Sequence, residues 1–117
     1  MPHHTSDEMR ECIDRCQTCQ ETCLDVITHC LEKGGEHADA EHIRMLMVCA
    51  EICGTSARFM LLGSPYHTRT CEVCADVCQA CAEDCDRFDD DMMKHCADVC
   101  RRCAEACREM AATRSRA

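Results

Sequence analysis

Residues 96–107 read Cys-Ala-Asp-Val-Cys-Arg-Arg-Cys-Ala-Glu-Ala-Cys, with four cysteines at alternating steps of four and three residues. Such steps keep side chains on one face of an α-helix, and they are typical of helices that pack against partner helices. The same pattern recurs at residues 12–23 and 74–85, and residues 49–53 keep a single step of four. The face that ordinarily holds leucine and isoleucine is therefore lined with thiols, and we expect the interior of the fold to be the functional site.

This periodicity predicts an all-α fold, an antiparallel four-helix bundle with a cysteine-lined core. Caps and breakers place the helices at about residues 5–33, 39–62, 65–87 and 90–112. Because the connections between them are short, consecutive helices should run antiparallel. A chain of 117 residues has the length of one domain, so residues 1–117 are expected to form a single domain.

Short local motifs set these boundaries. Thr5 and Glu8 have the spacing of a capping box at the start of a helix. The pair Gly34-Gly35 predicts the end of the first helix, because glycine accepts the backbone conformation of a helix C-terminus. Ser64-Pro65 predicts an N-cap and a first-turn proline at the start of the third helix. The three aspartates at residues 89–91 suit the start of the fourth helix, where negative charge is favoured.

The charge balance, the hydropathy and the N-terminal segment argue against several classes of partner and predict the compartment of the protein. The formal net charge is −9, and no basic stripe is present to neutralise phosphates, so no nucleic acid partner is expected. No apolar run approaches the roughly 18 residues of a membrane span, so no membrane association is expected. Residues 1–11 contain no export signal, which predicts a cytoplasmic protein whose thiols stay reduced.

The cysteine rows are poorly placed for disulfides within one helix. Residues four apart on a helix have Cβ atoms about 5–6 Å apart, whereas a disulfide needs about 3.5–4.5 Å. Two thiolates on one metal ion can span about 4.6 Å, since each bond is about 2.3 Å long. The aromatic fraction is only 3%, so bound metal would also supply stability that a thin core lacks. The rows therefore predict metal ligation.

The choice of metal follows from the softness and spacing of the ligands. Thiolate selects Cu(I), Zn(II) or iron–sulfur clusters. Structural zinc sites usually place Cys-x2-Cys pairs around a turn, and bacterial iron–sulfur ligation uses successive steps of three residues. This chain has its three-residue steps inside helices and never two in succession. Cu(I) accepts low coordination and best fits long rows of sulfur, with a capacity on the order of one ion per cysteine.

Two other functions also fit the cysteine rows. The first is a metallothionein-like protein that detoxifies Zn(II) or Cd(II), with about four tetrahedral thiolate sites for zinc. The second is an iron–sulfur protein for electron transfer. An enzyme is not expected, because rows of equivalent thiols offer no base placed beside a distinct nucleophile.

A chain with Cys-x3-Cys on every predicted helix, an acidic balance and no export signal resembles the bacterial four-helix-bundle copper storage proteins, most of all their cytosolic branch. The resemblance extends over about Thr5 to Met110. It implies inward-facing cysteines that bind many Cu(I) ions, and a homotetramer of bundles. The Cu(I) ligands that it implies are Cys12, Cys16, Cys19, Cys23, Cys30, Cys49, Cys53, Cys71, Cys74, Cys78, Cys81, Cys85, Cys96, Cys100, Cys103 and Cys107.

One end of the predicted bundle gathers methionine and histidine beside its last cysteines. These are weaker and more exchangeable Cu(I) ligands than thiolate, which suits a mouth that admits copper. We expect His42, Met45 and Met93 to make first contact with incoming copper. Copper donor and acceptor proteins are the expected protein partners. His29 and His37 are predicted to be surface or loop residues.

Overall fold

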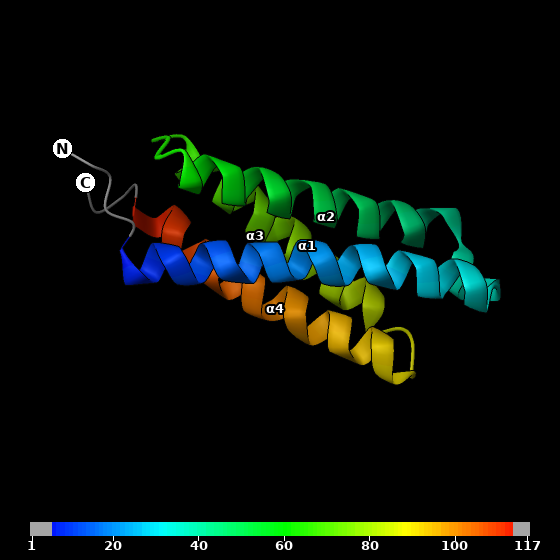
Figure 1. Ribbon diagram of the computed structural model, residues 1–117. Coiled ribbons are helices and arrows are strands. Elements are labelled where there is room, and N and C mark those ends of the chain that lie inside the picture. Colours follow the sequence, from blue (N-terminus) through cyan, green and yellow to red (C-terminus); the bar gives the residue numbers. More distant parts are fainter. Residues whose placement is uncertain (1–5, 114–117) are drawn as a thin grey trace.

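Four α-helices form a bundle in the computed structural model, which describes residues 6–113 (Figure 1). They are α1 (Asp7–Lys33), α2 (Ala40–Leu61), α3 (His67–Cys85) and α4 (Asp91–Ala112), with a short 3-10 helix, η1 (Gly35–Ala38), between α1 and α2. The predicted all-α four-helix bundle is confirmed. None of the described helices is long and apolar enough to cross a membrane.

Contacts between sulfur atoms establish the direction of the helices. Near the start of α1, the Cys12 sulfur lies 3.8 Å from that of Cys107 near the end of α4. Near the end of α1, the Cys30 sulfur lies 3.6 Å from the Met93 thioether in the first turn of α4. α1 and α4 are therefore antiparallel, as the short connections predicted.

The ends of α1 follow from local hydrogen bonding. Ser6 is the N-cap, and its hydroxyl accepts a hydrogen bond of 3.0 Å from the backbone N–H of Met9. The predicted capping box depends on Thr5, which lies outside the described residues. At the other end, the N–H of Gly34 donates to the Cys30 carbonyl, and Gly34 has a φ of +73° that disfavours other residues. The predicted stop at this glycine is confirmed.

α3 begins two residues later than its predicted start at Pro65. Ser64 and Pro65 belong to a turn, in which the Ser64 hydroxyl accepts from the N–H of Tyr66 at 3.1 Å. The Ser64 carbonyl then accepts from the N–H of His67, the first residue of α3. Ser64 therefore caps the turn that leads into the helix and is not the N-cap itself.

Cysteine accounts for 16 of the 30 buried apolar residues in the described core. All sixteen cysteines are buried, each at most 1% exposed, and all are free thiols. Ile13, Val26 and Leu46 are among the few large aliphatic side chains that are fully buried beside them. Alanines such as Ala82 and Ala104 fill much of the remaining space. Because small residues predominate, the helices pack closely around the thiols.

Candidate metal centre

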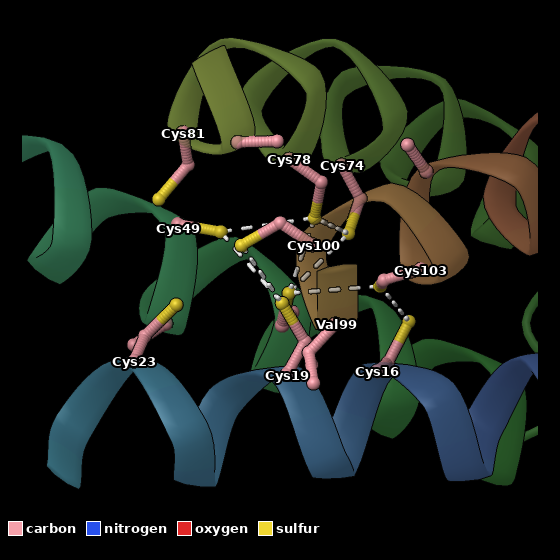
Figure 2. Close-up of a cluster of buried hydrophobic side chains, with 14 of the residues drawn as sticks. Cys16, Cys19, Cys23, Cys49, Cys74, Cys78, Cys81, Val99, Cys100 and Cys103 are labelled. Carbon is pink, nitrogen blue, oxygen red and sulfur yellow. Dashed lines mark hydrogen bonds between the residues drawn. The ribbon is translucent and has the colours of Figure 1, made fainter. Parts of the chain in front are cut away.

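The thiols of all four helices meet along the axis of the bundle (Figure 2). Neighbouring sulfur atoms lie close together, from 3.5 Å between Cys53 and Cys78 to 3.9 Å between Cys19 and Cys49. These distances are much longer than the roughly 2.05 Å of a disulfide bond. The predicted inward orientation of the cysteines is confirmed, and we call the resulting array of buried sulfur atoms the thiol column.

Four groups of cysteines within the column bring all their sulfur atoms within 4.8 Å of one another. They are Cys12, Cys71 and Cys107; Cys16, Cys74, Cys103 and Cys107; Cys19, Cys53, Cys78 and Cys103; and Cys19, Cys23, Cys49 and Cys100. Each group shares one member with the next, namely Cys107, Cys103 or Cys19. The groups therefore form one continuous array, in which a shared thiolate can bridge two metal ions.

The sulfur separations suit metal ions with three or four thiolate ligands. Bonds of about 2.3 Å place sulfur atoms about 3.8 Å apart in a tetrahedron and about 4.0 Å apart in a trigonal plane. A linear pair would need about 4.6 Å, which exceeds the separations between neighbouring sulfur atoms in the column. By distance alone, the column fits tetrahedral Zn(II) as well as Cu(I).

Burial acts to raise the pKa of the Cys30 and Cys71 thiols. At Cys30, burial raises the pKa to about 11, and the nearby carboxylate of Asp90 adds to the effect. At Cys71, a hydrogen bond with Cys107 acts to lower the pKa, but a hydrogen bond with Cys12 and burial outweigh it and raise the pKa to about 12. Metal binding must therefore release protons, because thiolate is the ligand.

α2 continues the register of the column with residues other than cysteine. Six of its buried residues are spaced by the same steps of four and three, namely His42, Leu46, Cys49, Cys53, Ser56 and Met60. The thioether of Met60 lies 3.9 Å from the sulfur of Cys71. Ser56 is fully buried, and within the described part of the chain its hydroxyl has no hydrogen-bond partner. Ser56 lies three residues after Cys53, so the helical spacing leads to this position although no cysteine marks it.

The predicted mouth lies beside η1, where His42 and Met93 converge on Cys30. The Cys30 sulfur is 3.3 Å from Nε2 of His42 and 3.6 Å from the Met93 thioether. Nδ1 of His42 lies 2.5 Å from a carboxylate oxygen of Asp84. When Nδ1 donates its hydrogen to Asp84, Nε2 presents a lone pair to the thiol, which is the tautomer that a metal ligand needs.

Phe88 covers this mouth. Its ring is 5% exposed, and the ring centroid lies 4.7 Å from that of His42. His42 and Met93 are themselves fully buried, whereas Met45 is half-buried at the edge of the core. Of the three residues predicted to meet incoming copper, only Met45 reaches the surface. The ring of Phe88 packs against that of the buried His42.

His29 and His37, which were predicted to be surface or loop residues, form a second cluster with Asp90. Nε2 of His29 and Nε2 of His37 each lie 2.8 Å from a different oxygen of the Asp90 carboxylate. Burial acts to raise the pKa of Asp90, but hydrogen bonds from His37 and His29 outweigh it and lower the pKa to about 2. The three residues lie on α1, on η1 and at the N-cap of α4, so no sequence spacing connects them.

Comparisons with known proteins identify relatives over most of the chain. The profile of the copper storage protein family matches residues 5–112. A crystal structure of a protein from Nitrosospira multiformis is 50% identical, with a TM-score of 0.87, and the match covers 91% of this chain and 96% of that one. No curated protein matches the chain.

Two further solved structures contain copper. The Cu(I)-bound copper storage protein BsCsp3 of Bacillus subtilis is 37% identical, with a TM-score of 0.84, and the match covers 90% of this chain and 99% of that one. The copper storage protein Ccsp from Streptomyces lividans, loaded with 10 copper equivalents, is 29% identical, with a TM-score of 0.83. That match covers 96% of this chain and 92% of Ccsp.

Proposed function

Because the chain belongs to the copper storage protein family, we propose that it stores Cu(I) in the thiol column with all sixteen cysteines as ligands. The observation that carries this assignment is the continuity of the column, in which groups of free, buried thiols share Cys19, Cys103 and Cys107. Shared thiolates allow multinuclear Cu(I) binding, so one chain holds several ions. Storage accounts for the whole array of thiols without a catalytic step.

Charge favours Cu(I) over Zn(II) inside the column. One Cu(I) for each thiolate leaves the buried array neutral. About four tetrahedral Zn(II) ions would leave eight of sixteen negative charges without compensation, and buried unpaired charge is costly. The sulfur separations fit both metals, so electroneutrality is the physical reason to prefer Cu(I).

Anaerobic titration with Cu(I) against a competing chelator tests the storage function. We expect tight binding of many Cu(I) ions, on the order of one per cysteine. Cys103→Ser should lower the capacity by more than the matched variant Cys30→Ser, because Cys103 belongs to two of the sulfur groups and Cys30 to none. A chain that takes up only about four Zn(II) and few Cu(I) would instead support the detoxification of Zn(II) or Cd(II).

We assign the admission of copper to His42, Met45 and Met93. The support for this role is the contact of His42 and Met93 with Cys30 and the position of Met45 at the surface edge. Replacing all three by alanine should slow Cu(I) uptake in stopped-flow measurements and leave the capacity nearly intact. A large loss of capacity at an unchanged uptake rate would contradict this assignment.

The proposed biological unit is a homotetramer of single-domain bundles in the cytoplasm, served by copper donor and acceptor proteins. Sixteen free thiols suit a reducing compartment. Met47 and Val48 of α2 are 55% and 51% exposed, which suits burial against a second copy. Light scattering should return about four times the 13.2 kDa of one chain. Replacing both Met47 and Val48 with glutamate should lower the mass measured by light scattering.

A further inference from the structure

The cluster of His29, His37 and Asp90 lies outside the thiol column and is not needed for Cu(I) storage. Its three ligand atoms, two imidazole nitrogens and a carboxylate oxygen, lie within 4.8 Å of one another. The side chains of His29, His37 and Asp90 are 22%, 15% and 23% exposed, so water and ions can reach them. Packing holds the cluster in place, because the His37 ring lies 4.2 Å from the Phe88 ring and 5.8 Å from the His29 ring, measured between centroids.

The carboxylate of Asp90 faces the two histidines and makes no capping hydrogen bond to α4. It is the N-cap residue of α4, where an aspartate side chain ordinarily accepts a hydrogen bond from the first turn of the helix. Here the carboxylate makes no such bond, and each of its oxygens faces an imidazole at 2.8 Å. Three elements, α1, η1 and the start of α4, thus direct one ligand each to a single point.

We propose that His29, His37 and Asp90 form a second metal site, which binds a divalent cation of the zinc class. Imidazole and carboxylate are ligands for borderline and harder divalent ions, whereas Cu(I) is selected by the soft thiolates of the column. Three protein ligands leave a fourth position for water. The site is therefore chemically separate from the Cu(I) store in the same chain.

Binding replaces the hydrogen bonds within the cluster with bonds to the cation. In the metal-free cluster, each Nε2 carries the hydrogen that it donates to Asp90, because an ionised carboxylate only accepts. The cation takes the place of these hydrogens at Nε2. In a neutral ring the hydrogen moves from Nε2 to Nδ1 and no proton is released, whereas a protonated ring keeps its Nδ1 hydrogen and releases the one on Nε2. Metal bonds of about 2.0–2.2 Å require nitrogen and oxygen to separate to about 3.4 Å, an opening of roughly half an ångström.

A cation at this site would join the connection between α1 and α2 to the start of α4. It would also hold His37 against Phe88, the ring that covers His42 at the mouth of the column. Occupancy of the second site is therefore expected to make Phe88 harder to displace. Slower Cu(I) exchange in the presence of Zn(II) would follow from this coupling.

The test uses protein whose thiols are first saturated with Cu(I), so that they do not compete for the probe. Calorimetric titration with Zn(II) should show one ion per chain. His37→Gln and Asp90→Asn should each weaken binding at least about tenfold, the loss that even an outer-sphere change causes at metal sites. Co(II) in place of Zn(II) should give a visible spectrum of nitrogen and oxygen ligation, without the intense charge-transfer bands of thiolate.

Two controls separate a metal site from a structural hydrogen-bond network. Glutamine at position 37 keeps a donor for Asp90 but removes the imidazole, so a purely structural cluster tolerates this change. His95→Ala removes an exposed histidine of α4 and should leave Zn(II) binding unchanged. The proposal is overturned if Cu(I)-loaded protein binds no Zn(II), if His37→Gln binds it as the parent does, or if the Co(II) spectrum shows thiolate. Failure of Cu(I) loading would instead count against the storage function.

Discussion

At the scale of single residues, cysteine serves both as core side chain and as ligand. Neutral thiols pack as small hydrophobes, and all sixteen cysteines of the bundle are free and buried. Cu(I) binds them as thiolates, so each ligand loses its proton when the metal enters. Phe88 packs its buried ring against that of His42, which lies next to Cys30.

Phe88→Ala should speed Cu(I) uptake, because it removes the ring that lies over His42. The capacity should stay the same, since no sulfur ligand is lost. Truncating a buried phenylalanine to alanine costs about 3–5 kcal/mol of stability. Phe88→Leu keeps an apolar side chain and is therefore the matched control. Its rate of Cu(I) uptake should lie between those of the unmutated protein and Phe88→Ala. Stopped-flow mixing with chelated Cu(I) measures the rate. Equal rates in all three proteins would show that the ring does not limit uptake.

At the scale of elements, α2 differs from the other helices in what occupies its inward face. Cys49 and Cys53 are followed by Ser56 and Met60 at positions where the other helices have thiols. α2 therefore closes its side of the column with a hydroxyl and a thioether. The buried hydroxyl is unfavourable, because no group in the described part of the chain satisfies it.

Ser56→Cys should extend the row of α2 and raise the Cu(I) capacity by about one ion, by the ratio of one ion per thiolate. The metal-free protein should not lose stability, because the substitution removes an unsatisfied hydroxyl worth about 1–3 kcal/mol and changes the volume little. Ser56→Ala removes the same hydroxyl without adding sulfur. It should therefore be as stable as Ser56→Cys and should bind as many Cu(I) ions as the unmutated protein. The anaerobic Cu(I) titration measures capacity, and an unchanged count for Ser56→Cys would mean that position 56 lies outside the metal-binding part of the column.

At the scale of the whole molecule, the bundle has little hydrocarbon to stabilise it. Two phenylalanines, one tyrosine and no tryptophan are spread over 117 residues. Metal that binds only the folded chain adds its binding free energy to the stability of the fold. Storage and stability are therefore coupled in this protein.

Loading with Cu(I) should raise the melting temperature in proportion to the number of ions bound. A ligand at a hundred times its dissociation constant adds about 2.7 kcal/mol per site. Circular dichroism of metal-free and loaded protein measures the shift, and a Cu(I) chelator should reverse it. Equal melting temperatures would show that the metal-free bundle already has its full stability.

Sequence periodicity was enough to predict the helices and the face that each presents inward. The alternation of three and four residues is a local property of the α-helix, so the position of Cys103 on the inner face of α4 needs no knowledge of the other helices. Soft ligands at this spacing also predicted the metal. Boundaries were less certain, as at Pro65, because a turn and a first helical residue have similar local preferences.

The contacts of side chains across different helices could not be predicted from the sequence and required the folded structure. The sharing of Cys19 between two sulfur groups, the cover that Phe88 places over His42, and the convergence of two histidines on Asp90 all join residues from separate elements. Such contacts depend on the rotation and axial shift of one helix relative to another. Periodicity along a single helix carries no information on either quantity, because it describes each helix alone.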